Sequence, residues 1–89
     1  MVLIVKRKGH KEKFDEKKAY ASCYYAARNC HYSEQKSEKI ASAALSKLKS
    51  WLKGKNEIDS AELFQFIAKQ LKQIDKDAGF MYETHRDIN

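Results

Sequence analysis

Cationic side chains and carboxylates are interleaved over residues 3–18, near the amino end of the chain. The first eighteen residues hold seven lysines and arginines against three carboxylates, so most of the net charge of +6 lies there. Lysine and arginine side chains are suited to phosphate oxygens, because a guanidinium offers two parallel donors and an ammonium acts as a point charge. The pattern indicates a site for a small anionic ligand. The alternative is a solvated basic hairpin whose charges keep a strand edge from aggregating.

The expected local structure of this segment is a strand, a tight turn, a second strand and a helix start. The apolar run over residues 3–5 predicts the first strand, and Gly9 can take the positive φ that a two-residue hairpin turn requires. Asp15 is a good N-cap, since its carboxylate can accept from free N–H groups of the first turn. Lysines in that turn oppose the helix dipole, which favours a binding role for them.

Apolar residues at helical spacing predict four helices, over about residues 16–30, 34–53 and 60–74, and, after a corner at residues 75–77, from Ala78 onwards. Ser33 is the expected N-cap of the second helix, and Gly54 is expected just past its end. Residues 57–58 suggest a short third strand. Asp59 with Glu62 resembles a capping box at the start of the third helix, where Ser60 is an alternative cap.

Length and composition favour one domain over residues 1–89 with a small core, because 89 residues leave no room for two. The chain has no proline and three glycines, which suits long helices. No apolar run approaches the roughly 20 residues of a membrane span, so we expect a cytoplasmic protein with no membrane contact. The sequence pI of about 9.3 admits nucleotides and nucleic acid as partners.

The residues that commonly carry catalysis or bind metals form no recognised motif. Cys23 and Cys30 would lie about 10.5 Å apart along one helix, farther than the roughly 7 Å that a disulfide allows between Cα atoms. We therefore expect free thiols. The three histidines are far apart in sequence, and no serine lies in a nucleophile elbow. We do not expect an enzyme.

The opening of the chain resembles the signature of the ATP-cone family over one run of residues, Val5-Lys6-Arg7-x-Gly9-x-x-Glu12-x-Phe14-Asp15-x-x-Lys18. Two later segments also resemble that family, Ile58-Asp59-Ser60-Ala61-Glu62-Leu63 and Ala78-x-x-x-Tyr82-x-x-x-Arg86. The resemblance implies a mainly α (α+β) fold, in which a four-helix bundle is capped by a small N-terminal β-hairpin or three-stranded sheet. It further implies a regulatory module that binds ATP or dATP, with or without Mg²⁺, between the hairpin and the helix ends.

Eight residues match binding positions of that family: Ile4, Val5, Lys6, Arg7, Glu12, Asp15, Lys18 and Ser60. By the resemblance, the three cations contact phosphates, the two carboxylates face the base and the ribose, the two aliphatic side chains touch the base, and the serine helps to bind. Simpler structural roles stay open for three of them. Asp15 and Ser60 are helix caps in any case, and Glu12 can pair with a lysine across the hairpin.

The chain departs from the family pattern at Lys8, Ala19 and Phe64, which leaves the ligand set and the number of nucleotides open. A free-standing module of this kind would change its association with itself or with a partner protein, such as a reductase or a regulator. One alternative is a small basic helical domain that binds nucleic acid. Another is an interaction domain that exposes Phe66 or Tyr25 to a partner helix.

Overall fold

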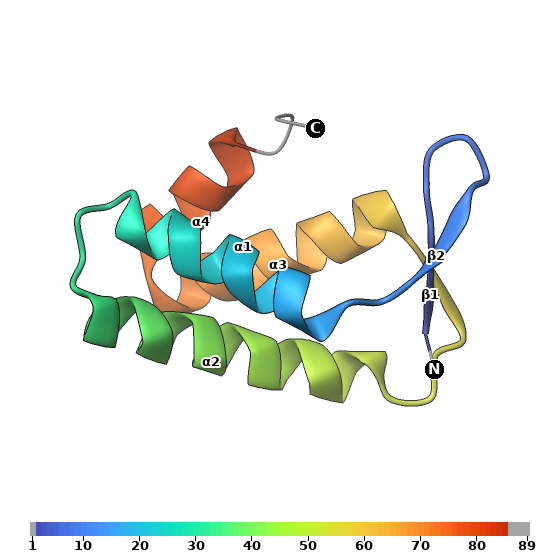
Figure 1. The fold of residues 1–89 in the computed structure, drawn as a ribbon, viewed down its shortest axis with the longest axis horizontal. Coiled ribbons are helices and arrows are strands. Elements are labelled where there is room, and N and C mark those ends of the chain that lie inside the picture. Colours follow the sequence, from blue (N-terminus) through green and yellow to red (C-terminus); the bar gives the residue numbers. More distant parts are fainter. Residues whose placement is uncertain (1, 86–89) are drawn as a thin grey trace.

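The computed structural model describes residues 2–85 and is mainly helical, with one small sheet at an end of the helices (Figure 1). Its elements in chain order are β1 (Leu3–Val5), β2 (Lys11–Lys13), α1 (Glu16–Arg28), α2 (Glu34–Leu52), β3 (Glu57–Asp59), α3 (Ser60–Ile74) and α4 (Lys76–Thr84). The expected helices and the three-stranded sheet are confirmed. Arg86, which carried part of the family resemblance, lies outside the described residues.

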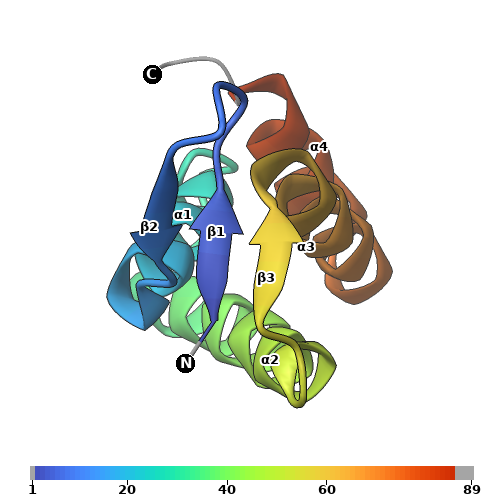
Figure 2. The same ribbon diagram turned by 90° about the vertical axis from the view of Figure 1, so that its right-hand side faces the viewer.

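The sheet has the order β2-β1-β3 and is mixed, with β2 antiparallel and β3 parallel to the central strand. Figure 2 shows it lying across the ends of the helices. Ile4 pairs with Glu12 on one side and with Ile58 on the other. Directly paired residues share a face of a sheet, and both isoleucines are buried. The face that carries Glu12 is therefore the one turned toward the helices.

The hairpin turn is longer than the two-residue turn that the sequence suggested. The Lys6 carbonyl accepts from Gly9 N at 2.9 Å, and Lys6 N donates to His10 O at 2.6 Å. Three residues thus form the loop, and Gly9 takes the expected positive φ of 83° at its end. A turn closed by a left-handed glycine is the common three-residue hairpin connection. It places Arg7 and Lys8 at the tip of the loop.

Small side chains on α1 allow close packing against its neighbours. Its buried face consists of Ala19, Cys23, Ala26 and Ala27, as the helical spacing predicts. α1 packs against α2 and α4, and α3 packs against the same two helices. A regular four-helix bundle stays a prediction.

Local hydrogen bonds fix several helix ends near their expected positions. The Ser33 hydroxyl accepts from Lys36 N at 3.1 Å and caps α2, and Gly54 follows that helix with φ 79°. α1 is shorter than expected. It ends at Arg28, because the chain turns directly after it and His31 takes a left-handed φ of 66°.

The starts of α3 and α4 differ from the prediction. Asp59 precedes α3 but makes no capping hydrogen bond through its side chain, so its half of the predicted capping box is missing. α4 begins at Lys76, inside the predicted corner, because Asp75 is its N-cap and accepts from Ala78 N through Oδ2 at 3.0 Å.

Phe66 and Tyr25, the two side chains considered for partner contact, differ in their exposure to solvent. Phe66 on α3 stacks on Trp51 of α2 with ring centroids 4.2 Å apart, and it is partly buried. Tyr25 on α1 is 62% exposed. Of the two residues considered for partner contact, only Tyr25 is therefore well exposed. None of the helices in the described part of the chain is long and apolar enough to cross a membrane.

Candidate nucleotide cleft

An open cleft of about 1340 Å³ lies under the hairpin and continues between α1 on one side and α3 and α4 on the other. The hairpin loop and α4 rise on the same side of the molecule, above α1 and α3 (Figures 1 and 2). Ligand sites commonly have volumes of roughly 300–1,000 Å³, so this cleft has room for a nucleotide.

Seven of the eight residues predicted to bind line this one cleft: Ile4, Lys6, Arg7, Glu12, Asp15, Lys18 and Ser60. Val5 does not line it. Successive side chains of a strand point to opposite faces, and Ile4 faces the helices, so Val5 lies on the outer face of the sheet, where it pairs with Lys11 and Asp59. Strand alternation alone could have shown this.

Charge is concentrated at the hairpin end of the cleft. Its lining there includes five cationic side chains and two carboxylates: Lys6, Arg7, Lys8, Lys13 and Lys18, with Glu12 and Asp15. Lys6 Nζ lies 3.3 Å from Glu12 Oε1, and both side chains are about half exposed. The cross-hairpin pairing considered from the sequence is thus present. Exposed ion pairs contribute little stability, so a phosphate can compete for this lysine.

The two helices that begin at the cleft differ in how their free N–H groups are satisfied. Asp15 Oδ1 accepts from Lys17 N at 3.0 Å and from Lys18 N at 3.3 Å, so α1 is already capped. α3 receives no cap from Asp59, and Ser60, its first residue, lines the cleft. Free N–H groups at a helix N-terminus attract anions. The start of α3 is therefore the better placed of the two for phosphate.

Aromatic and neutral side chains line the rest of the cleft, away from the hairpin cations. Tyr25 of α1 and Asn29 directly after it line one side, and Met81 and Tyr82 of α4 with His85 directly after it line the other. The Tyr82 ring also stacks on Phe64 of α3, with centroids 5.1 Å apart. Aromatic faces in a cleft suit the flat ring of a nucleobase.

The sequence contained a signal for Tyr25 and Asn29 and not for the residues of the α4 segment. Tyr25 and Asn29 are seven and eleven residues after Lys18, so helical spacing places all three on one face. Helical spacing could therefore have assigned Tyr25 and Asn29 to the cleft. The α4 residues enter it only because α4 folds back against α1, which is a tertiary contact that periodicity does not encode.

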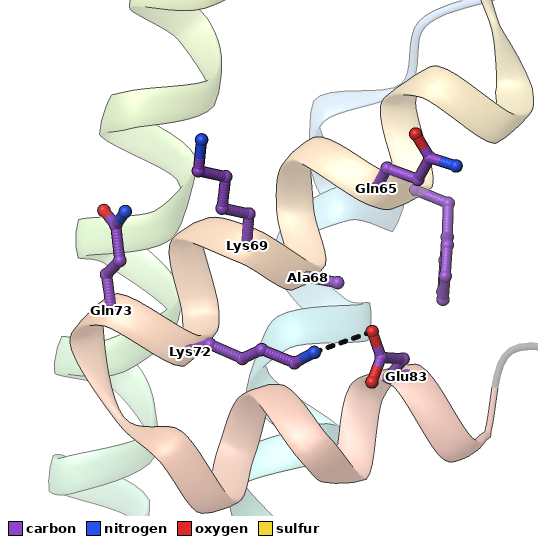
Figure 3. A pocket seen from close by; sticks show the side chains of 7 residues that line it. Gln65, Ala68, Lys69, Lys72, Gln73 and Glu83 are labelled. Carbon is purple, nitrogen blue, oxygen red and sulfur yellow. Dashed lines mark hydrogen bonds and ion pairs between the residues drawn. The ribbon is translucent and has the colours of Figure 1, made fainter.

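A second, smaller hollow of about 410 Å³ lies on the outer side of α3 beside α4 (Figure 3). Lys72 Nζ and Glu83 form an ion pair there at 2.8 Å, so the two charges already satisfy each other. The cleft under the hairpin is the stronger candidate, because it is larger and gathers several cations. Among residues 2–85, no cluster of His, Cys, Asp or Glu side chains is arranged to hold a metal ion.

Both cysteines are free thiols that lie outside the cleft lining. Burial raises the pKa of the Cys23 thiol from its ordinary value of 9.0 to about 12. The pKa of Cys30 is also raised, by burial and then by the nearby carboxylates of Asp75 and Asp77. A raised pKa disfavours the thiolate, which is the nucleophilic form. Neither thiol is thus set up for nucleophilic chemistry.

Comparison with protein-family models matches residues 2–82 to the family described as the ATP cone domain. A comparison with curated proteins gives no match. The family match spans nearly all of the 89 residues, including the three strands, the first three helices and most of α4. It agrees with the resemblance that the opening motif indicated. The chain therefore belongs to the ATP-cone family.

Proposed function

We propose that the cleft binds ATP or dATP and that the bound nucleotide regulates the association of this chain with itself or with a partner protein. ATP-cone domains are in general nucleotide-binding regulatory modules, not catalytic ones. The observation that carries the proposal for this chain is the shared cleft, which is lined by Lys6 and Arg7 of the hairpin and by Lys18 of α1. The family match supports nucleotide binding and not the nucleic-acid alternative.

The triphosphate lies at the hairpin end in this proposal. Lys6 and Arg7 approach it from the hairpin, Lys18 from α1, and the uncapped start of α3 supplies N–H donors near Ser60. Charge-assisted hydrogen bonds of this kind are roughly twice as strong as neutral ones. Any Mg²⁺ would be held mainly by the phosphates, as such ions usually are at nucleotide sites.

The base lies toward Tyr25 in this proposal. Lys18 and Tyr25 are about 10.5 Å apart along the axis of α1, a separation that an extended nucleotide can span. Glu12 and Asp15 were expected to face the base and ribose, but both already have partners, in Lys6 and in the α1 backbone. Tyr25, in contrast, is 62% exposed within the cleft.

Binding changes the charge balance under the hairpin, and this gives the nucleotide a way to signal. A triphosphate that takes Lys6 from Glu12 breaks an ion pair within the hairpin and connects Lys6 and Arg7 of the hairpin with Lys18 of α1. A ligand shifts an equilibrium between conformations only by its difference in affinity for them, and a nucleotide that contacts both the hairpin and α1 favours the conformation in which they lie close together. The partner in this regulation, by the family resemblance, is a ribonucleotide reductase or a regulator of its genes.

Titration calorimetry with ATP, dATP and GTP tests the proposal, with Lys18→Ala as the diagnostic variant. Loss of a charge-assisted contact should weaken ATP binding about tenfold or more. Stability should not fall, because a lysine near a helix N-terminus opposes the dipole. Lys39→Ala, an exposed α2 position outside the cleft, is the matched control and should bind ATP normally. Absence of binding at millimolar ATP would overturn the proposal.

A further inference from the structure

Tyr32, in the connection between α1 and α2, makes polar contacts through its hydroxyl, its carbonyl and its ring. Its hydroxyl donates to Asp75 Oδ2 at 2.9 Å. Its carbonyl accepts from Arg28 Nη1 at 2.9 Å, and Lys36 Nζ lies 3.6 Å from the centre of its ring. The ring is therefore held independently of its hydroxyl, and only the hydroxyl reaches across to α4.

The acceptor of this bond also begins α4. Asp75 Oδ2 takes the Tyr32 hydroxyl and Ala78 N together, the latter at 3.0 Å. One oxygen thus caps α4 and joins it to the loop that follows α1, although the two residues are 43 positions apart. The hydroxyl stays a donor over the physiological range, because the bond to Asp75, together with burial, raises the pKa of Tyr32 to about 12.

The position of this bond relates it to the cleft. Tyr32 follows the end of α1 and Asp75 precedes α4, whereas the hairpin covers the opposite end of α1 (Figure 1). Met81 and Tyr82 near the end of α4, and His85 directly after it, line the cleft together with Tyr25 of α1. A hydrogen bond at the start of α4 therefore limits how far the other end of this helix, which lines the cleft, can move from α1.

We propose that the Tyr32–Asp75 hydrogen bond sets the spacing of α1 and α4 across the nucleotide cleft, which makes Tyr32 a positioning residue for the base. The inference rests on the proposed function, because it assigns the α1–α4 part of the cleft to the nucleobase. Tyr32 touches no ligand itself. Its effect is confined to the aromatic end, since the phosphate-binding cations belong to the hairpin and the start of α1.

The test is calorimetry of Tyr32→Phe with two ligands, ATP and inorganic tripolyphosphate, which has the phosphates but no base. Tyr32→Phe removes the hydroxyl and keeps the ring under Lys36. Loss of one hydrogen bond should raise the Kd for ATP about two- to tenfold, with the Kd for tripolyphosphate unchanged. A general loss of protein stability would weaken the binding of both ligands equally. The ratio of the two Kd values therefore distinguishes an effect on base positioning from an effect on folding.

Substitutions of Asp75 provide a matched pair. Asp75→Asn keeps one side-chain oxygen at the same position, which can accept from both Tyr32 and Ala78 as Oδ2 does, and should bind ATP normally. Asp75→Ser still caps α4 but is too short to reach Tyr32, and should reproduce the loss seen in Tyr32→Phe. The double variant of Tyr32→Phe with Asp75→Ser should then bind no more weakly than either single one.

Each outcome decides between the two proposals. Unchanged ATP affinity in Tyr32→Phe, or an equal loss for ATP and tripolyphosphate, would overturn the positioning role and leave nucleotide binding standing. An additive loss in the double variant would do the same. Failure of the unsubstituted chain to bind ATP would instead overturn the proposed function, and the positioning role with it.

Discussion

Replacement of Gly79 by alanine tests how closely α3 and α4 approach. Gly79 is buried on α4, and a Cβ built there would lie 2.5 Å from Lys72 Cγ, 2.6 Å from Lys72 N and 2.8 Å from Lys72 Cα. Two of these atoms belong to the α3 backbone, so moving a side chain cannot relieve the clash. Figure 3 shows the Lys72 side chain extending from α3 to Glu83 on α4. The helices must therefore separate to admit a methyl group.

The magnitude follows from two opposing effects. Overpacking of a core typically costs about 1–3 kcal/mol, and a clash with backbone belongs at the upper end. Alanine is better than glycine inside a helix by about 1 kcal/mol. The net loss in the free energy of unfolding should be about 2 kcal/mol, which lowers Tm by about 8–16 °C in a domain of this size. Thermal and urea unfolding, followed by circular dichroism, measure it.

Gly54→Ala is the control, because nothing lies within 4 Å of a Cβ at that position. Its cost arises only from the positive φ of 79°, and asparagine, which tolerates that conformation, should recover most of it. Asparagine at Gly79 should be at least as damaging as alanine. The reasoning is refuted if Gly79→Ala is as stable as the unsubstituted chain, since helix propensity would then outweigh the contact.

Two further predictions concern the base and the buried thiol. Tyr25→Ala should weaken ATP binding about tenfold by calorimetry, because stacking on an aromatic ring is worth about 1–3 kcal/mol per base. Phe80 is similarly exposed but lies outside the cleft, so Phe80→Ala should leave ATP affinity unchanged. An equal loss of ATP affinity in the two variants would contradict the assigned base position. Burial raises the pKa of Cys23 from 9.0 to about 12, so the thiol ionises first in the unfolded chain and stability should fall as pH rises from 9 toward 12. Urea unfolding of Cys23→Ala should show a shallower fall with pH, and an unchanged slope would count against burial as the cause.

The helices could be predicted well from the sequence because their signals are local. Apolar residues at spacings of three and four gave α3 its bounds, and the Ser33 cap fixed the start of α2. Errors occurred where local alternatives compete. The segment before Ala78 was expected to be a corner, but Asp75 caps a helix there and α4 begins at Lys76. Gly9 was placed correctly, whereas the loop length depended on the pairing of Lys6 with His10.

The lining of the cleft could be predicted in part because most of the predicted residues come from one short segment. Six of the seven that line the cleft lie between Ile4 and Lys18, so the geometry of one hairpin and one helix start gathers them. The family resemblance grouped Val5 with Ile4, but strand alternation places Val5 on the outer face of the sheet, outside the cleft lining. The side chains on α4 could not be assigned, because their place in the cleft depends on how α4 packs against α1.

The sequence by itself determined the helical segments, the basic hairpin and the family resemblance, since spacing, capping residues and charge act over a few neighbouring positions. Only the tertiary structure decided that Lys6 is paired with Glu12, that Tyr32 reaches Asp75, and that Gly79 meets α3. Tyr32 and Asp75 are 43 positions apart, and the other two contacts join residues on either side of a turn. These contacts depend on which faces of the helices and strands pack against each other. A periodic pattern predicts that a face is buried, but it does not predict which other element covers that face.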